Sequence, residues 1–210
     1  MLRYKTVCRE GEATLVIEKS KFIAYVKPVS TVEEAEAFIT SVRVSHRDAT
    51  HNVPIYVLGE RFETQKYSDD GEPSGTAGVP VLQMLTKEGI TNTAIVITRY
   101  FGGIKLGTGG LVRAYTGAAK EGLKAAGIAG VRDMQVMDAV IDYTFHGKAS
   151  GLVSRGDFII RDTRFTDKVT LEIVCDPEKA DETKTLLNEV TAGTVVFQNE
   201  HEELVSVEEV

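Results

Sequence analysis

The stretch TAIVITRYFGGIKLGTGGLVRAY, residues 93–115, decides how the first part of this chain folds. Residues 93–100 are mostly β-branched or apolar, which predicts a buried strand. Five glycines follow within a short window: Gly102, Gly103, Gly107, Gly109 and Gly110. Apolar residues then recur at helical spacing from Leu111 to Ala126, where Gly127 ends the pattern. We therefore expect a strand, a glycine-rich loop and a helix in this order.

The glycine-rich loop has the features of an anion site. The N-terminus of a helix carries unpaired N–H groups and about half a positive charge, and glycines let a phosphate approach the backbone closely. Arg99 and Lys105 flank the loop, and Arg113 and Lys120 share one stripe of the helix. Such a row of cations suits the phosphates of RNA better than one nucleotide. The predicted phosphate or RNA contacts are Arg99, Gly102, Gly103, Lys105, Gly107, Gly109, Gly110, Arg113 and Lys120.

Other interpretations of the loop stay open. The dinucleotide-binding glycine pattern is absent, and Thr108 stands where a P-loop requires lysine. A charged stripe is also the ordinary solvated face of an amphipathic helix. The glycines could instead only permit tight packing of the helix on the strand. The sequence does not choose between these roles and an anion site.

A second group of candidate residues comprises His51, Asp69, Asp70 and Glu72. A histidine beside carboxylates could act as a base with its orienting group, and the same groups could hold a divalent metal. The spacing matches no metal motif, however, and the segment SDDGEPSGTAG, residues 68–78, has the composition of a turn. We interpret the segment first as a structural turn, keep the four residues as weak catalytic candidates, and predict neither a metal nor another cofactor.

Charge is distributed unevenly along the 210 residues. Residues 1–135 carry 17 basic and 15 acidic residues, a net charge of +2, whereas residues 136–210 carry 7 and 16, a net charge of −9. An acidic second half repels nucleic acid, so a polyanion should contact the first half. The chain shows neither an apolar leader nor a membrane-spanning run, so we expect a cytoplasmic protein. Cys8 and Cys175 are expected to be buried, reduced thiols.

The first half contains further strands and helices. Two or three strands are expected within residues 1–28, with a turn at residues 10–12. Thr31 and Glu34 form a capping box that starts a helix ending near Val42. Its candidate core residues are Val32, Ala35, Phe38, Ile39 and Val42.

A strand is predicted from Val53 to Gly59, and Pro54 suggests that it lies at a sheet edge. Residues 61–67 show the alternating side-chain pattern of a strand and could pair with the strand at 53–59. A short helix containing Pro80 should then end at Gly89.

The pattern of the second half predicts six elements in this order. A strand over 136–145 and a helix over 148–155 come first, and a hairpin of strands over 158–165 and 168–175 follows. A helix from Asp176-Pro177 to about 190 and a strand over 194–207 complete the chain. The order β-α-β-β-α-β is that of the ferredoxin-like split βαβ unit. We therefore expect an α+β protein with two domains, residues 1–134 and 135–210.

Three segments resemble the YigZ/IMPACT family. They are TRYFGGIKLGTGGLVRAYTGAA at 98–119, SDDGEPSGTAGVPVLQML at 68–85, and the pair KSKFIAYVKPV at 19–29 and ATHNVPIYVLG at 49–59. The resemblance covers the whole chain, as in the bacterial two-domain members. One departure is Val53-Pro54-Ile55-Tyr56, where the family has a small residue before tyrosine; it affects only the local pairing of that strand.

The resemblance implies an N-terminal domain with the ribosomal protein S5 domain 2-like fold and a ferredoxin-like C-terminal domain. Domains of these folds meet RNA on the ribosome, and eukaryotic IMPACT relatives act in translational control through a protein partner. We therefore expect a translation-related protein that binds RNA or the ribosome through its N-terminal domain. The alternatives are a regulatory module that binds another protein and a hydrolase centred on His51 and residues 69–72. Oligomeric state is left open.

Overall fold

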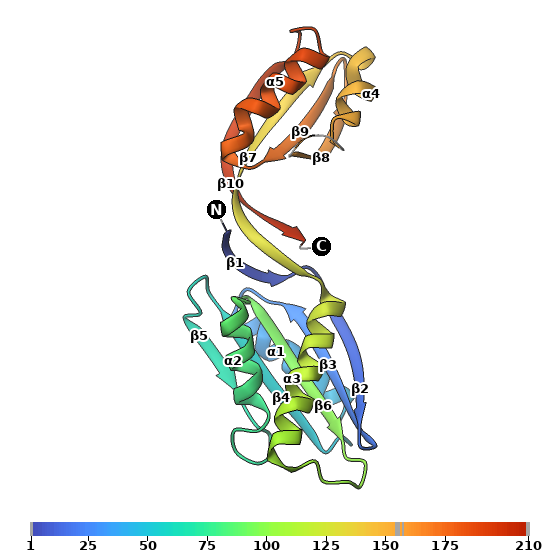
Figure 1. The fold of residues 1–210 in the computed structure, drawn as a ribbon, viewed down its shortest axis with the longest axis vertical. Coiled ribbons are helices and arrows are strands. Elements are labelled where there is room, and N and C mark those ends of the chain that lie inside the picture. Colours follow the sequence, from blue (N-terminus) through green and yellow to red (C-terminus); the bar gives the residue numbers. More distant parts are fainter. Residues whose placement is uncertain (1, 154–155, 157, 209–210) are drawn as a thin grey trace. The chain divides into compact units, whose positions relative to one another are not determined.

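The computed structural model describes residues 2–153, 156 and 158–208, and they form two compact units. The first unit comprises residues 2–131 with 206–208, and the second comprises residues 132–205. Strand β7 (Ile128–Ile141) contributes residues to both units (Figure 1). The division thus falls after residue 131, inside a continuous strand, whereas the sequence placed it after residue 134.

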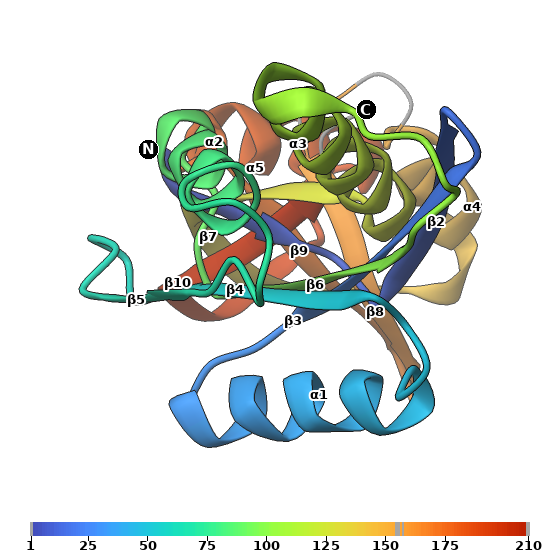
Figure 2. The same cartoon turned by 90° about the horizontal axis from the view of Figure 1, so that it is seen from below.

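The first unit is built on an antiparallel sheet with strand order β2-β3-β6-β4-β5. The strands are β2 (Gly11–Ile17), β3 (Ser20–Pro28), β6 (Thr93–Tyr100), β4 (His51–Leu58) and β5 (Thr64–Tyr67). Helix α1 (Val32–Ser45) covers one face, and α2 (Gly78–Glu88) and α3 (Gly107–Ala126) cover the other (Figure 2). The predicted strand at 93–100 is confirmed and lies at the centre of the sheet, which explains its apolar composition.

The two faces of this sheet have separate hydrophobic cores. On the α2–α3 face, Phe22 packs edge-on against Tyr115 with ring centroids 5.2 Å apart. On the α1 face, Ala35, Ile39 and Val42 are buried as predicted. Val32 is 39% exposed instead, because the first residue of the helix lies beyond the edge of the core.

Helix α1 begins at the predicted N-cap. Thr31 Oγ1 accepts a hydrogen bond from the amide of Glu34 at 3.2 Å. The Glu34 carboxylate accepts from the amide of Ser30 at 2.7 Å rather than from that of Thr31, so the capping box is shifted by one residue. The helix continues past Val42 to Ser45, where His46 is its C-cap.

Two local predictions in the first unit are wrong. Residues 11 and 12 belong to strand β2 rather than to a turn, because a β-carbon at Gly11 would overlap the backbone of Ala126 and the glycine serves this close approach. Strand β4 pairs with both β6 and β5, so Pro54 does not mark a sheet edge. The amide of Ser68 donates to the carbonyl of Pro54 at 3.1 Å, but proline has no amide to donate in return, and the β4–β5 ladder ends next to it at Ile55.

The second unit has the predicted order β-α-β-β-α-β. After β7 come α4 (Tyr143–Gly151), β8 (Phe158–Phe165), β9 (Val169–Cys175), a 3-10 turn (Pro177–Lys179), α5 (Ala180–Val190) and β10 (Val196–Glu208). Its sheet has the order β7-β9-β8, with β10 on the other side of β7; β1 (Leu2–Val7) also pairs with β7.

The boundaries differ from the prediction at both ends of β7, which begins at Ile128 rather than at residue 136, and at the start of α4. The strand was predicted to continue to residue 145, but β7 ends at Ile141, and Tyr143 and Phe145 lie in the helix. The predicted helix at 148–155 therefore begins five residues earlier, at 143, and residues 154–155 lie outside the described residues. Asp176 followed by Pro177 does start a helical segment as predicted. Cys175 is buried and Cys8 is exposed, so only one of the two free thiols is buried as expected.

Candidate nucleic-acid interface

The loop between β6 and α3 is shorter than the glycine pattern suggested. Helix α3 begins at Gly107 rather than Leu111, so Gly107, Gly109 and Gly110 lie in its first turn. Gly102 serves packing, because a β-carbon there would overlap the main chain of Lys19. Gly103 has φ +87° and Gly107 has φ +67°, and a β-carbon at either would meet no atom within 4 Å. Packing thus accounts for Gly102 but not for these two residues, whose surroundings are open.

The first turn of α3 has no capping side chain. Leu106 is the N-cap residue, and it cannot accept hydrogen bonds from the first amides as serine or aspartate would. Gly107, Thr108 and Gly109 are exposed. Unpaired N–H groups at the start of a long helix attract anions.

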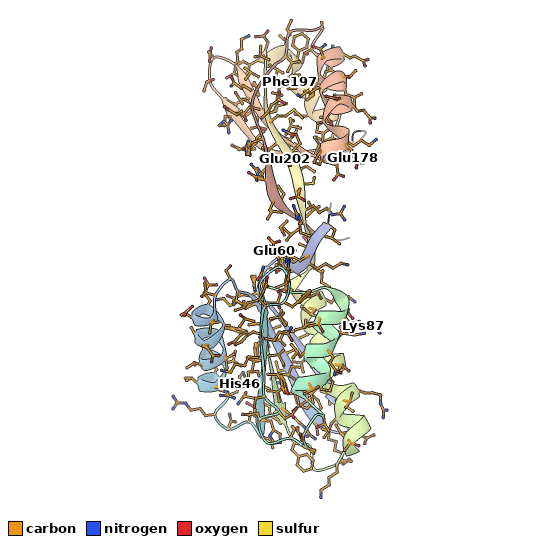
Figure 3. The ribbon with its side chains drawn as sticks, turned by 90° about the vertical axis from the view of Figure 1, so that its left-hand side faces the viewer. His46, Glu60, Lys87, Glu178, Phe197 and Glu202 are labelled. Atoms are coloured by element: carbon orange, nitrogen blue, oxygen red, sulfur yellow. The ribbon has the colours of Figure 1, made fainter. Side chains whose placement is uncertain are left out.

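Two further segments meet the glycine-rich loop at this end of the first unit. In the β2–β3 turn, Ser20 Oγ accepts from the amide of Gly102 at 3.1 Å. In the loop after α1, Thr50 donates its amide to the carbonyl of Arg99 at 2.9 Å, and Thr50 Oγ1 accepts from the amide of Phe101 at 3.1 Å. Figure 3 shows His46, which ends α1, at this end of the sheet, and Glu60 at the opposite end.

Five exposed basic residues belong to these segments: Lys19, Lys21, Arg47, Lys105 and Arg113. We call this set the basic end. None of the five forms an ion pair with another described residue. In the sequence, Lys19 and Lys21 beside Phe22 favour a solvated turn over a base-stacking contact. Only the pairing of β3 with β6, which places Lys21 opposite Tyr100, joins them to this end of the unit. Arg47 gave no sequence signal at all.

Arg99 does not belong to the basic end, contrary to the sequence prediction. It is only 5% exposed, and Nη1 donates to Oε1 of Glu72 at 2.6 Å. Its guanidinium carbon lies 5.2 Å from the ring centroid of Phe22 and 5.5 Å from that of Phe101. A guanidinium buried in this way cannot reach a phosphate at the surface, so its role is to hold the loop in place.

Lys120 also lies apart from the predicted site. Seven residues of helix place it about 10 Å along the axis from Arg113, and its ammonium group is 3.7 Å from the carboxylate of Glu88. A β-carbon added at Gly117, between them, would lie 3.3 Å from Leu15 of β2, so this glycine offers no open approach. The basic stripe is therefore concentrated at the N-terminus of α3.

The weak catalytic candidates build a turn. Asp69 accepts hydrogen bonds from the amides of three residues, Gly75, Ala77 and Gly78, at 2.8–3.1 Å. Asp70 accepts from Arg43 at 3.0 Å and from the amide of Asn52 at 2.7 Å. His51 Nδ1 donates to the backbone carbonyl of Asp70 at 2.7 Å. The structural interpretation of this segment is supported, since both aspartates are engaged and neither carboxylate orients His51.

Glu72 is the exception in that segment, because it is buried. Oε1 accepts from Arg99, accepts from the hydroxyl of Tyr115 at 2.7 Å, and lies 3.7 Å from Nε2 of His51. Burial, followed by the hydrogen bond to Glu72, raises the pKa of Tyr115 far above its usual value. This buried network fixes the segment 68–78 to β6 and α3.

A pocket of about 380 Å³ opens above this network. It lies between the turn after Asp70, the end of β6 and the start of α3. We call it the α3 pocket, and its lining residues are Glu72, Pro73, Arg99, Phe101, Lys105, Leu106, Gly107, Thr108 and Leu111. It therefore joins a buried carboxylate, an exposed aromatic ring and an uncapped helix terminus.

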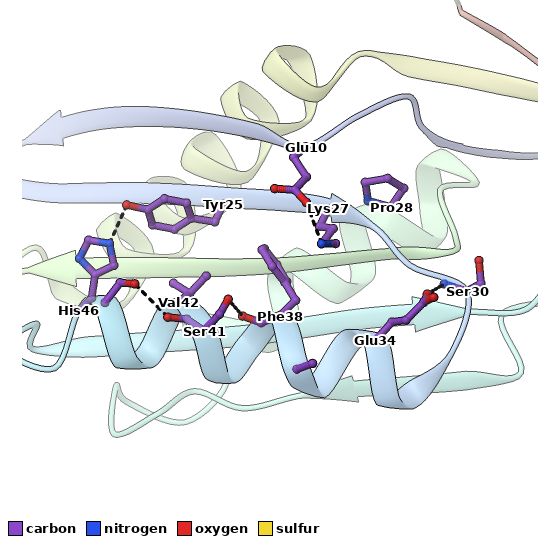
Figure 4. A pocket seen from close by; sticks show the side chains of 12 residues that line it. Glu10, Tyr25, Lys27, Pro28, Ser30, Glu34, Phe38, Ser41, Val42 and His46 are labelled. Carbon is purple, nitrogen blue, oxygen red and sulfur yellow. Dashed lines mark hydrogen bonds and ion pairs between the residues drawn. The ribbon is translucent and has the colours of Figure 1, made fainter.

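A larger cavity of about 740 Å³ lies beside α1 (Figure 4). Its polar groups bind one another: Lys27 pairs with Glu10 at 2.7 Å, and the hydroxyl of Tyr25 lies 2.7 Å from Nε2 of His46. The Glu34 carboxylate is occupied by the helix cap. These side chains therefore leave few polar groups for a ligand, and the basic end is the stronger candidate for a functional site.

Two properties of the described residues bear on other functions. They contain no cluster of three or more histidine, cysteine or acidic residues arranged to hold a metal ion. Within the same residues, no helix combines the length and apolar character needed to cross a membrane.

Comparison with known proteins agrees with the resemblance seen in the sequence. Residues 18–123 match the Impact N-terminal domain, and residues 140–194 match a domain of unknown function, DUF1949. The IMPACT family member YvyE of Bacillus subtilis is 42% identical over 190 residues, which cover 90% of this chain and 88% of that protein. IMPACT family member YigZ of Escherichia coli is 46% identical over 110 residues, covering 51% of this chain and 54% of that protein.

A solved structure described as that of a hypothetical protein is also similar, with 31% sequence identity and a TM-score of 0.58. The alignment covers 94% of this chain and 97% of that one. The matched domains, the extent of the similarity to YvyE and the glycine-rich segment itself show that the chain belongs to the IMPACT family.

Proposed function

We propose that the first unit binds RNA, in the setting of translation and the ribosome, through the basic end and the N-terminus of α3. The observation that carries this proposal is the meeting of five exposed, unpaired cations with an uncapped helix terminus and the 46%-exposed ring of Phe101. Cations position phosphates, free amides donate to phosphate oxygens, and an exposed aromatic ring stacks on a base. These three elements together are typical of a single-stranded nucleic-acid site.

The charges favour a polyanion over a protein partner of ordinary composition. Asp69, Asp70 and Glu72 do not compensate the basic end, because they are engaged by amides, Arg43 and Arg99 respectively. With residues 136–210 carrying a net charge of −9, the contact belongs to the first unit. A role on RNA or the ribosome would place the protein in the cytoplasm.

The fold assignments support this proposal by analogy only. We assign the first unit to the S5 domain 2-like fold and the second to the ferredoxin-like fold. The second unit's element order and its β10-β7-β9-β8 strand order support the latter assignment. Domains of both kinds contact RNA on ribosomes.

The alternatives differ in their support. A regulatory module that binds another protein would use Phe101 and Ile104, which are exposed at the same loop. The hydrolase requires His51 to be oriented by an aspartate carboxylate, and His51 contacts the Asp70 backbone instead. We therefore keep the first alternative and do not propose the second.

The proposal is tested by RNA binding over a series of salt concentrations. Fluorescence anisotropy of a labelled, unstructured RNA strand should show affinity falling steeply with salt, because each neutralised phosphate releases counterions. Lys105→Ala with Arg113→Ala should flatten the slope by roughly 1.4, because each phosphate that is no longer neutralised on a single strand lowers the slope by about 0.7.

The matched control is Lys87→Ala with Lys124→Ala, which removes the same charge from exposed positions at the C-terminal ends of α2 and α3. The control should keep the wild-type slope. Absence of binding at low salt, or equal slopes for the two double variants, would refute the proposed function.

A further inference from the structure

We infer that the α3 pocket receives one unpaired nucleotide of the bound RNA. This inference rests on the proposed function and specifies the kind of RNA that the site takes. The basic end by itself would bind any polyanion. The pocket adds an aromatic ring and a carboxylate, which the phosphates of a polyanion would not need.

The first observation concerns two buried polar side chains that line the pocket. Glu72 and Arg99 are both more than nine-tenths buried. All described contacts of the Glu72 carboxylate go to Oε1, and no described residue donates to Oε2. The acceptor Oε2 of this otherwise buried side chain, which lines the pocket, is therefore available to a ligand. Nε of Arg99 is buried without a hydrogen-bond partner among the described residues, and because it has no accessible surface it can only support the wall of the pocket.

The second observation is the chemical variety of the pocket wall. The exposed first turn of α3, with Lys105 and the hydroxyl of Thr108, offers donors for a phosphate. Phe101 presents an aromatic ring, and its neighbour Arg99 adds positive charge against that ring. The carboxylate of Glu72 is an acceptor for an amino group of a base or for a 2′-hydroxyl group. A nucleotide carries an anion, a flat ring and such donors within one molecule.

The third observation is size. A pocket of about 380 Å³ lies at the lower end of the range of small-ligand sites, which begins near 300 Å³. This volume suits one base with its sugar. A base can enter only when it is unstacked and unpaired, so the site should prefer single strands or loops over duplex RNA.

The experiment compares oligouridylate with a duplex of oligoadenylate and oligouridylate of the same length, at one low salt concentration. Wild type should bind the single strand about tenfold more tightly than the duplex, which corresponds to one stacked base. Phe101→Ala should lose this tenfold preference while keeping its affinity for the duplex. Phe101 is half exposed, and circular dichroism would verify that the variant keeps its fold.

Phe101→Trp is the conservative variant, and it should restore the preference. The chain contains no tryptophan, so the new indole is the only one and reports on the pocket directly. Its fluorescence should be quenched by oligouridylate and unchanged by the duplex.

The outcomes separate the two proposals. If wild type binds neither RNA, both the proposed function and this inference fail. If it binds strand and duplex equally, or if Phe101→Ala leaves the preference unchanged, the nucleotide pocket is refuted while polyanion binding stands. Binding of a protein partner that Phe101→Ala abolishes, without any RNA binding, would assign the loop to protein recognition instead.

Discussion

The guanidinium of Arg99 and the carboxylate of Glu72 form a buried ion pair, with Nη1 2.6 Å from Oε1, beneath the loop that follows β6. The pair joins the central strand of the sheet to the turn at residues 68–78. It thereby sets the positions of Pro73 and Phe101 on the wall of the α3 pocket. Arg99, which the sequence suggested as a direct phosphate contact, instead supports the wall of the α3 pocket through this ion pair.

Breaking this pair should destabilise the first unit strongly. Arg99→Met leaves the Glu72 carboxylate buried without its charged partner, and we expect a loss of about 3–5 kcal/mol in the free energy of unfolding. Arg99→Met combined with Glu72→Met should recover part of the loss, because no uncompensated charge remains. Urea unfolding measures both. The exposed control Arg47→Met should change stability by less than about 0.5 kcal/mol, and a similarly small effect of Arg99→Met would contradict our description of the pair.

Gly102 should tolerate no side chain. Gly102→Ala forces a β-carbon into the main chain of Lys19, and we expect a loss of about 3 kcal/mol or more. Gly103→Ala is the matched control: its φ of +87° costs about 1–2 kcal/mol in strain, but no atom stands in the way. Thermal unfolding of the two variants should therefore give a clearly lower midpoint for Gly102→Ala. Equal midpoints would show that the β2–β3 turn does not pack against the loop.

The carboxylate of Asp69 should contribute to the free energy of unfolding of the first unit. Its carboxylate accepts three amide hydrogen bonds at the start of α2, so Asp69→Ala should cost about 2 kcal/mol. Asp69→Asn keeps one acceptor oxygen and should cost about half as much. Chemical denaturation tests both, with the exposed Glu60→Ala as control. If Asp69→Ala proved as stable as wild type, the structural role that we give to these three hydrogen bonds would be wrong.

The second unit should lose stability in acid through Glu172. The hydrogen bond from Arg161, 2.6 Å from the carboxylate, lowers the pKa of Glu172 below its usual value near 4.3. A lowered folded-state pKa contributes stability that is fully present above pH 4.3 and is lost as the pH falls through the folded-state pKa. Glu172→Gln should therefore destabilise at pH 7 and make stability less dependent on pH in the acid range.

Urea midpoints at neutral and acidic pH would measure this difference, with Glu202→Gln as an exposed control that should leave the pH dependence unchanged. The same pH dependence in Glu172→Gln as in wild type would show that another group is responsible.

Much of the fold was predictable from the sequence because local signals agreed with the final structure. The apolar run at 93–100 became the central strand, and Gly89 and Gly127 ended helices. The boundary of β7 failed because Tyr143 and Phe145 continue the alternating pattern, although Tyr143 is half exposed in α4. A residue pattern of period two cannot show where the hydrogen-bonded ladder stops.

The site was predictable only in part. Lys105 and Arg113 are adjacent to the glycines in sequence, and both belong to the basic end. Arg99 was misjudged, because its partner Glu72 lies 27 residues away and only the tertiary structure brings them together. Lys19, Lys21 and Arg47 could not be added for the same reason, since strand pairing and the α1–β4 loop place them beside the glycine loop.

The location of the RNA is the central claim, and ultraviolet crosslinking followed by mass spectrometry of the crosslinked peptides tests it most directly. With oligouridylate bound at low salt, we expect the crosslinks on Phe101 and on neighbouring residues of the loop and of the β2–β3 turn. The control Phe101→Ala should lose the principal crosslink without losing the protein's fold. Crosslinks confined to residues 132–205 or to the cavity beside α1 would contradict the account.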